Sequence, residues 1–268
     1  MPRLLSAAVL IPPLLLWLLF APAWLFTLIV ALAAAVAASE LVLMTAAERS
    51  RLALALVAPA SFAYVWSFTE AWDGTLPAIL ALFVSLLLTL HMGIGVRGRR
   101  TVDELALSCF AVLYVGGLLG YLVPLHAAPH GVRLVLLLFA CVWIGDTLAF
   151  VGGKVWGRRA LAPRLSPRKT VEGAMAGLAG SLLAALLGKL TGAVPLPWGV
   201  VLSLAVVMGL AGQLGDLMES LLKRSVGVKD AGGLLPGHGG LLDRIDGLLL
   251  AAPASYFWLK FLERFLGR

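Results

Sequence analysis

Long runs of apolar residues, interrupted by short polar segments, make up most of the chain. A helix needs about 20 apolar residues to cross the hydrocarbon core of a bilayer. Nine segments meet that criterion, at residues 4–20, 22–46, 52–70, 76–96, 105–125, 131–151, 171–192, 197–218 and 243–263. The pattern therefore predicts an all-α, polytopic integral membrane protein with about nine transmembrane helices.

The first apolar run follows Arg3 and begins like a signal peptide. Its apolar residues continue with little break to Ala47, and no convincing cleavage site is followed by a soluble domain. We therefore expect an uncleaved first span. The boundary between the first two spans is the least sharp, because only Ala21, Pro22 and their neighbours separate them.

Composition excludes two other classes of protein. Of the 268 residues, 61% are hydrophobic and 13% are charged, whereas a soluble domain carries about 25% charged residues. The chain has too little polar surface for a water-soluble globule and too little charge for a disordered chain. Cys109 and Cys141 lie inside apolar runs without the spacing of a zinc or redox motif, so we assign them no function.

The basic residues predict the orientation, because cytoplasmic loops of membrane proteins are enriched in Lys and Arg. With the N-terminus in the cytoplasm, nine spans put sixteen of the 21 basic residues on the cytoplasmic side. They are Arg3, Arg49, Arg51, Arg97, Arg99, Arg100, Lys154, Arg158, Arg159, Arg164, Arg168, Lys169, Lys223, Arg224, Lys229 and Arg244. We therefore expect a multi-pass protein of the cell membrane with a cytoplasmic N-terminus. The net charge of +7 then reflects topology and needs no nucleic-acid partner.

Ionisable residues inside membrane spans are costly and therefore mark functional sites. Residues 1–130 form a region of about five N-terminal helices with few such residues. Residues 131–268 form a predicted catalytic region whose helices are joined by cytoplasmic loops at 152–170 and 219–242. Its four helices present ionisable groups at one depth on the cytoplasmic side: Asp146, Lys169, Glu172, Asp216, Glu219, Asp243, Arg244 and Asp246.

Three other polar residues have simpler explanations. Lys189 is near the outer end of its span and can extend its ammonium group to the interface. Glu40 and His91 are isolated within apolar runs, and we expect them to form hydrogen bonds between helices.

The densest polar stretch covers residues 220–246. Asp243 and Asp246 are three residues apart and share a helix face, so their charges repel unless a cation lies between them. Hard cations such as Mg²⁺ take oxygen ligands, and glycine-rich segments can turn backbone N–H groups toward an anion. Lys223, Arg224 and Lys229 add cationic donors suited to phosphate oxygens. This combination points to phosphoryl or nucleotidyl transfer.

Each component also has an alternative explanation. An Asp pair can cap a helix or pair with Arg244, His238 can be a turn residue, and the bases can be topology signals alone. Their joint occurrence within 27 residues favours a site.

The stretch resembles the phosphatidate cytidylyltransferases (CDP-diacylglycerol synthases). Their signature S-x-x-K-R-x4-K-D-x-G-x-x-L-P-x-H-G-G-x-x-D-R-x-D matches at every fixed position from Ser220 to Asp246. Two upstream stretches are similar to the family as well. The first comprises Asp146-Thr147, Gly152-Gly153 and residues 166–173, and the second comprises residues 212–217 with Glu219 and Ser220. One small departure is Phe150, where the family more often has Tyr. The resemblance is strong over residues 140–250, and the N-terminal half matches only as a set of apolar spans.

The resemblance implies an integral membrane enzyme that makes CDP-diacylglycerol and pyrophosphate from CTP and phosphatidate, with Mg²⁺ and an active site facing the cytoplasm. It implies that Asp216, Asp243 and Asp246 hold one or two cations, with Asp146 as a further candidate ligand. Candidate catalytic residues are these three aspartates with Lys223 and Arg224. Candidate substrate-binding residues are Ser166, Lys169, Thr170, Lys229, Asp230, His238, Gly239, Gly240 and Arg244.

Two other functions remain open at this point. A CTP-using lipid kinase, such as a polyprenol kinase, would transfer the γ-phosphate instead. A transporter would also bury carboxylates, although transporters often show internal repeats and midplane sites, and no repeat is apparent here. The sequence leaves the oligomeric state open, with a homodimer as one candidate.

Overall fold

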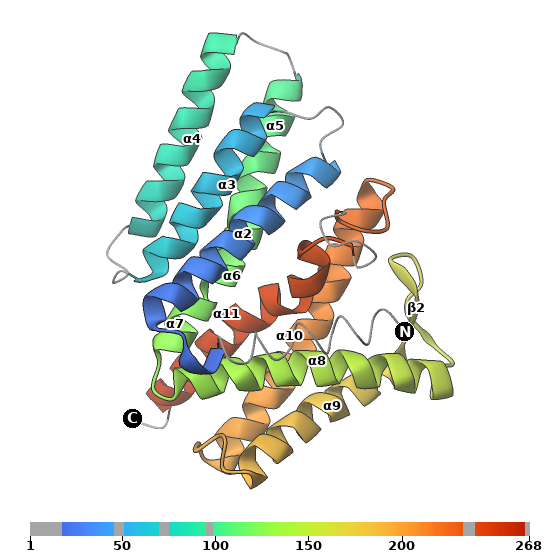
Figure 1. The fold of residues 1–268 in the computed structure, drawn as a ribbon. Helices are drawn as coiled ribbons and strands as arrows, with labels where there is room; N and C mark the ends of the chain where they lie inside the picture. The colour runs from blue at the N-terminus through green and yellow to red at the C-terminus, as the bar shows by residue number, and fades with distance from the viewer. Residues whose placement is uncertain (1–17, 46–50, 70–74, 95–98, 233–238, 266–268) are drawn as a thin grey trace. The chain divides into compact units, whose positions relative to one another are not determined.

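A computed structural model describes residues 18–45, 51–69, 75–94, 99–232 and 239–265, which are mostly helical (Figure 1). The chain forms two compact units. The first contains Met1–Pro124 and Asp230–Arg244, and the second contains Leu125–Lys229 and Ile245–Arg268. The signature stretch is thus divided between them, because its described residues 230–232 and 239–244 group with the N-terminal helices.

The first unit is a bundle of apolar helices. Its elements are α2 (Ala23–Thr45), α3 (Arg51–Trp66), the turn η1 (Ser67–Thr69), α4 (Thr75–Ile94), α5 (Arg99–Ala111), the π-helical segment η2 (Val112–Gly117), α6 (Leu118–Gly120) and the start of α7 (Leu122–Ala127). Helix α3 packs against α2, α4 and α5, and these helices run side by side in Figure 1. Fully buried leucines such as Leu41, Leu87 and Leu119 fill the bundle core.

The second unit contains longer helices and one small hairpin. Its elements are α8 (Gly131–Trp156), β1 (Ala160–Ala162), β2 (Ser166–Thr170), α9 (Val171–Leu190), α10 (Trp198–Ser225) and most of α11 (Leu242–Phe265). Helices α8 and α9 approach closely through small residues. A Cβ atom at Gly180 would lie 2.9 Å from the Ile144 carbonyl oxygen, and the Ser181 hydroxyl donates to the Cys141 carbonyl oxygen at 2.9 Å. Such packing is typical of helices in membranes.

The polar segments around the second unit are more regular than the sequence predicts. Helix α8 continues to Trp156, and residues 160–170 form an antiparallel hairpin that pairs Ala160 with Thr170 and Ala162 with Ser166. Helix α10 continues to Ser225, past the predicted start of the loop at 219. The length of an apolar run indicates only the part of a helix that lies in the hydrocarbon core. The helix itself can continue into the polar interface, where its backbone hydrogen bonds still form.

Six helical segments of the described residues are long and apolar enough to cross a membrane. They are Ala23–Thr45, Thr101–Ala127, Gly131–Trp156, Val171–Leu190, Trp198–Ser225 and Leu242–Phe265. Two shorter apolar helices, Ala53–Thr69 and Ala78–Leu90, coincide with two further predicted spans. The predicted span at 4–20 lies almost entirely outside the described residues, so the count of nine stays a prediction.

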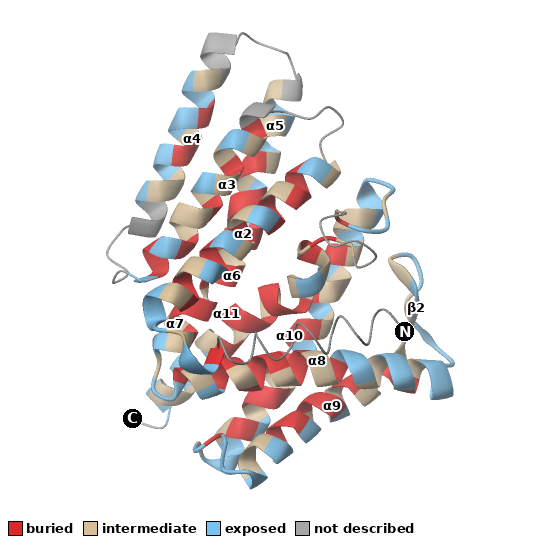
Figure 2. Cartoon of the chain, in the orientation of Figure 1, coloured by how far each residue is buried: buried red, intermediate tan, exposed pale blue. Residues whose placement is uncertain are grey.

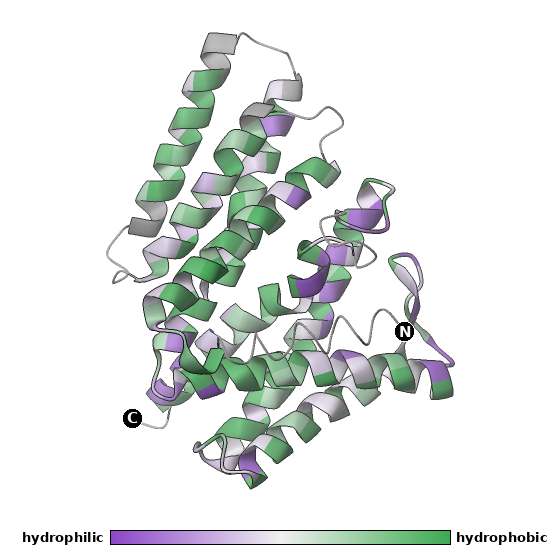
Figure 3. Ribbon diagram, viewed as in Figure 1, coloured by the Kyte–Doolittle hydropathy of each residue, from purple (hydrophilic) through white to green (hydrophobic). Residues whose placement is uncertain are grey.

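Large apolar side chains cover the outer surfaces of these helices. Leu82 is 70% exposed and Phe261 is 53% exposed. Exposed residues recur along the helices in Figure 2, and apolar residues predominate on α2, α3 and α4 in Figure 3. Exposed apolar surface of this extent is unfavourable in water and is covered by lipid in a bilayer. The protein is therefore an α-helical, multi-pass membrane protein.

Candidate active site

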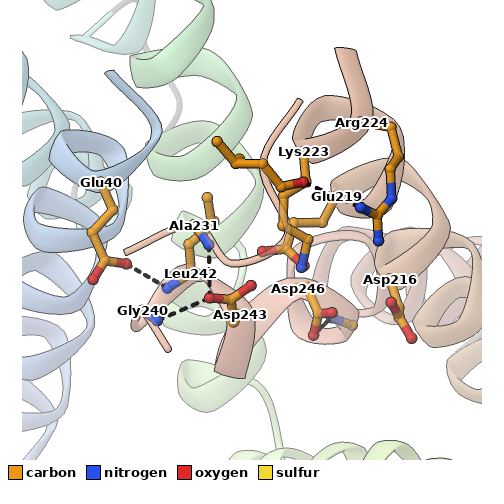
Figure 4. A network of polar contacts seen from close by, with 12 residues as sticks. Glu40, Asp216, Glu219, Lys223, Arg224, Ala231, Gly240, Leu242, Asp243 and Asp246 are labelled. Carbon is orange, nitrogen blue, oxygen red and sulfur yellow. Dashed lines mark hydrogen bonds and ion pairs between the residues drawn. The ribbon is translucent and has the colours of Figure 1, made fainter. Parts of the chain in front are cut away.

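Three carboxylates from two helices form an acidic cluster in the second unit (Figure 4). Asp216 and Glu219 are three residues apart on α10 and therefore share a face of that helix. Asp246 comes from α11, and one oxygen atom of each residue lies within 4.8 Å of those of the other two. Glu219 is fully buried, whereas Asp216 and Asp246 are partly exposed.

Glycines allow α10 and α11 to approach closely at the acidic cluster. A Cβ atom at Gly215 would lie 2.5 Å from the carbonyl oxygen of Asp246, a distance too short for any side chain. A Cβ atom at Gly247 would lie 3.0 Å from the Val142 side chain and 3.4 Å from the Gly212 carbonyl oxygen. The residues flanking Asp216 and Asp246 thus bring the two carboxylates together.

Two lysines pair with the acidic cluster. The ammonium group of Lys223 lies 2.7 Å from a Glu219 oxygen, one helical turn away on α10, and the Lys223 side chain is only 12% exposed. Lys169, from strand β2, pairs with Asp216. Asp146, on α8, is close enough to interact electrostatically with Asp246, Asp216 and Lys169. Acidic and basic groups from four elements therefore converge here.

Hydrogen bonds fix the backbone at the start of α9, directly after Lys169. The Thr170 hydroxyl caps this helix by accepting the Gly173 N–H at 3.1 Å. The Glu172 carboxylate accepts the N–H groups of Arg158 and Arg159 at 3.0 and 3.2 Å. The hairpin is therefore tied at its base to the first turn of α9, and Lys169 directly precedes the cap.

Arg224 connects the hairpin to the end of α10. Its Nε atom donates to the Leu165 carbonyl oxygen and its Nη1 atom donates to the Val228 carbonyl oxygen, both at 3.4 Å. The Arg224 side chain is exposed, so its remaining guanidinium donors can reach an anionic ligand.

In the first unit, Asp243 caps the start of α11. Its Oδ2 atom accepts the N–H of Gly240 at 2.8 Å and that of Ala231 at 2.9 Å (Figure 4). A carboxylate that accepts the N–H three residues earlier is the acidic half of a capping box. Asp243 therefore caps a helix in this structure, which is the alternative to metal binding that the sequence left open. Gly239 has a φ of 78°, which favours glycine, and a Cβ atom there would lie 2.8 Å from Asp243 Oδ2.

The structure thus brings together four residues predicted from the sequence, namely Asp216, Asp246, Lys169 and Lys223, with Asp146 nearby. Ser166 begins strand β2 and Thr170 caps α9. Lys229, Asp230 and Arg244 are exposed, and His238 lies outside the described residues.

Glu219 is the member of the acidic cluster that the predicted ligand set lacks. Its position three residues after Asp216 and four before Lys223 places all three on one helix face. That spacing could have identified Glu219 as a member of the cluster from the sequence.

The acidic cluster fits a hard divalent cation. Mg²⁺ binds oxygen ligands at about 2.0–2.1 Å, so two ligand atoms on one octahedral ion lie about 3–4 Å apart. The carboxylate oxygens of the cluster lie within 4.8 Å of one another, somewhat farther apart than this separation. Carboxylates without Cys or His ligands favour Mg²⁺ over Zn²⁺.

Comparison with known proteins shows the family of the chain. Residues 1–262 match the family described as "Cytidylyltransferase family", so the chain belongs to the cytidylyltransferase family. It is 39% identical over 196 residues to a phosphatidate cytidylyltransferase of Bacillus subtilis (strain 168), and the alignment covers 72% of each chain.

Two other relatives carry the same name. One, from Brucella abortus biovar 1 (strain 9-941), is 46% identical over 130 residues, or 48% of each chain. The other, from Synechocystis sp. (strain ATCC 27184 / PCC 6803 / Kazusa), is 42% identical over 143 residues, which are 50% of this chain and 45% of the relative. The chain thus aligns with about half the length of these two proteins.

Proposed function

We propose that this membrane protein transfers the cytidylyl group of CTP to phosphatidate, giving CDP-diacylglycerol and pyrophosphate. The match of residues 1–262 to the cytidylyltransferase family carries this proposal. The names of the relatives specify the lipid substrate. The acidic cluster with its paired lysines supplies the charge that such a site needs.

Magnesium is the proposed cofactor, held by Asp216, Glu219 and Asp246. Asp146 and Asp243 remain candidate ligands from the sequence, as does a second cation. When bound, Mg²⁺ neutralises phosphate charge and makes pyrophosphate a better leaving group.

The lysines of the site can neutralise the two anionic substrates. An ammonium group has three donors, so Lys169 and Lys223 can each hold a carboxylate of the acidic cluster and still donate to a phosphate oxygen. Arg224 and Lys229 add exposed positive charge at the end of α10. We assign these four residues to phosphate binding, with Ser166, Thr170, Asp230, His238, Gly239, Gly240 and Arg244 as further substrate-binding residues.

The reaction needs little help from a general base. Phosphatidate is a phosphomonoester with a second pKa of about 6, so it is mostly dianionic at neutral pH. One of its oxygens attacks the α-phosphorus of CTP, and the bond from that phosphorus to the bridging β-phosphate oxygen breaks. Positioning and charge neutralisation therefore dominate catalysis.

We also propose that the N-terminus and the active site face the cytoplasm. The contacts of the site and the distribution of basic residues support this orientation. Lys169, Asp216 and Asp246 meet near the start of α9, the end of α10 and the start of α11, so these helix ends share one side of the membrane. Sequential spans of alternating direction put all three on the side that carries most basic residues. Residues 131–268 remain the proposed catalytic region, and the homodimer remains a prediction.

Product analysis tests the function. Purified protein in detergent is supplied with phosphatidate and labelled CTP, with and without Mg²⁺. We expect a Mg²⁺-dependent lipid that carries labelled CMP, together with pyrophosphate. A phosphorylated lipid with CDP as the second product would indicate a lipid kinase instead. Solute uptake by proteoliposomes without any CTP-dependent lipid product would indicate a transporter.

A further inference from the structure

Glu40 connects the N-terminal helices to the signature stretch. It lies on α2, is only 7% exposed, and belongs to the same compact unit as residues 230–244. Its Oε1 atom accepts the N–H of Leu241 at 3.0 Å. Its Oε2 atom accepts the N–H of Leu242 at 2.8 Å (Figure 4). The hydrogen bond expected between helices exists, but its donors are backbone groups at the start of α11.

Three consecutive backbone N–H groups at the start of α11 therefore donate hydrogen bonds to carboxylates. Gly240 donates to Asp243, and Leu241 and Leu242 donate to Glu40. The first N–H groups of a helix have no partner within it and form a site for negative charge. The glycine-rich stretch was expected to offer such groups to an anion. At these three positions the anions are side chains of the protein itself.

Glu40 also explains two glycines of the signature. A Cβ atom at Gly232 would lie 2.9 Å from Glu40 Oε1, and one at Gly240 would lie 2.6 Å from Glu40 Oε2. Neither residue has a positive φ, so the Glu40 carboxylate, and not the backbone conformation, is what a side chain at either position would have to displace.

Because the Glu40 carboxylate is buried, it needs hydrogen-bond donors at defined positions. A buried carboxylate is costly unless it accepts hydrogen bonds in good geometry, and both oxygens of Glu40 have such a donor. The carboxylate in turn fixes where the first turn of α11 can lie. Asp243 is in that turn, and Asp246 follows one turn later on the same helix.

We propose that Glu40 is a positioning residue for nucleotidyl transfer. It fixes the start of α11 and thereby the orientation of the aspartates that this helix carries. This inference rests on the proposed function. Glu40 touches neither substrate nor metal in this role, so its effect is exerted through Leu241 and Leu242.

Glu40→Gln tests the role because it keeps the shape of the side chain and replaces one acceptor with a donor. We expect kcat/KM for CTP to fall by about 10- to 100-fold, the range seen when partners that orient metal ligands are removed. We also expect the Mg²⁺ concentration for half-maximal activity to rise, and the thermal midpoint of the purified protein to fall by a few degrees because one buried N–H loses its acceptor, with the variant still folded at the assay temperature. Glu263→Gln, the same change at an exposed residue of α11, should match the wild type in all three measurements.

A second pair of variants tests the contact directly. Gly232→Ala should lose activity because its new methyl group collides with Glu40. Combining Gly232→Ala with Glu40→Gln should cost little more activity than either change alone, because both changes act on the same contact. If Gly232 is needed for substrate access instead, the two losses of activity will multiply.

Two results would overturn the inference. One is a Glu40→Gln variant with wild-type kcat/KM and an unchanged Mg²⁺ requirement. The other is a loss of activity that merely follows the loss of folded protein. Either result, obtained beside an active wild type, overturns the role of Glu40 and leaves the proposed function standing. A wild type that makes no CMP-bearing lipid overturns the proposed function itself.

Discussion

Asp243 and Asp246 are three residues apart in the signature and have different partners in the structure. Asp246 faces Asp216 and Glu219 in the acidic cluster, whereas Asp243 accepts two backbone N–H groups beside its own helix start. Two identical side chains three residues apart in the motif are therefore a candidate metal ligand, Asp246, and a helix cap, Asp243.

Asp246→Asn should lower turnover by more than about 100-fold, because an amide replaces one charged oxygen ligand of the proposed Mg²⁺ site. The thermal midpoint should stay near that of the wild type, since the change relieves repulsion among three carboxylates. Turnover with CTP and Mg²⁺ is the measurement, and Asp103→Asn on α5, an exposed position, is the matched control. Near wild-type turnover by Asp246→Asn would remove Asp246 from the proposed metal site.

Asp243→Ala separates capping from metal binding, because alanine has no oxygen to accept the N–H groups of Ala231 and Gly240. Loss of a helix cap costs about 1 kcal/mol, which lowers the thermal midpoint by about 2–4 °C in a chain of this size. We expect that decrease with little change in the Mg²⁺ concentration for half-maximal activity. A large increase in that concentration, with an unchanged thermal midpoint, would instead make Asp243 a ligand, as the sequence predicts.

Lys169→Gln should impair substrate binding more than stability. The Lys169–Asp216 pair is about 30% exposed, and ion pairs of that exposure contribute about 0–1 kcal/mol to folding. Loss of a cation that contacts a phosphate should raise KM for CTP or phosphatidate, with a decrease of roughly 10-fold or more in kcat/KM. Lys154→Gln, at an exposed residue near the end of α8, provides the comparison. Equal kinetics of the two variants would argue against a substrate contact at Lys169.

Among the elements, the contact between α10 and α11 determines the geometry of the acidic cluster. Gly215 permits the close approach beside Asp216 and Asp246. Farther along the two helices, the Trp258 indole N–H donates to the Ser203 hydroxyl at 3.0 Å. The helices are thus fixed at two separate levels, and the acidic cluster lies at one of them.

Gly215→Ala should push α11 away from α10 and separate the carboxylates. Overpacking of this kind costs about 1–3 kcal/mol, and we expect both a lower thermal midpoint and a loss of most activity. Gly199→Ala on the same helix has no atom within 4 Å of the new methyl group, and alanine favours a helix over glycine by about 1 kcal/mol. That variant should be as stable as the wild type or more so. An active, stable Gly215→Ala variant would contradict this account of the contact.

At the scale of the whole molecule, lipid replaces water around most of the helices. The exposed apolar side chains of α4 and α11 require such an environment. Polar residues gather instead at the C-terminal end of α10 (Figure 3), the end that we propose faces the cytoplasm.

Cysteine labelling of intact cells tests the proposed orientation. Pro163→Cys lies in the hairpin and Ala193→Cys lies at the opposite end of α9, and both positions are exposed. In a background with Cys109 and Cys141 replaced by alanine, a membrane-impermeant maleimide should label Ala193→Cys and leave Pro163→Cys unlabelled until the cells are opened. The reverse pattern would place the active site outside the cell. Labelling of both from outside would contradict a membrane-spanning α9.

The sequence by itself determined the class of protein and named several residues that the structure brings together, among them Asp216, Asp246 and Lys169. Apolar runs of about 20 residues report contact with lipid, and the rarity of charge within them made Asp216 and Asp246 stand out. Those local signals also fixed most helices, because the i, i+3 spacing and the runs are properties of the chain alone. The helical extensions to Trp156 and Ser225 escaped prediction because hydropathy does not report backbone hydrogen bonds outside the hydrocarbon core.

Only the tertiary structure decided which polar residues meet. Glu219 joins the acidic cluster because α11 crosses α10 at Gly215, and Glu40 reaches a backbone about 200 positions away. The length of an apolar run contains no information on helix crossings or on the direction of a carboxylate. The physical reason is that a carboxylate accepts equally well from a metal, a lysine or a backbone N–H, and the packing of neighbouring helices selects among them.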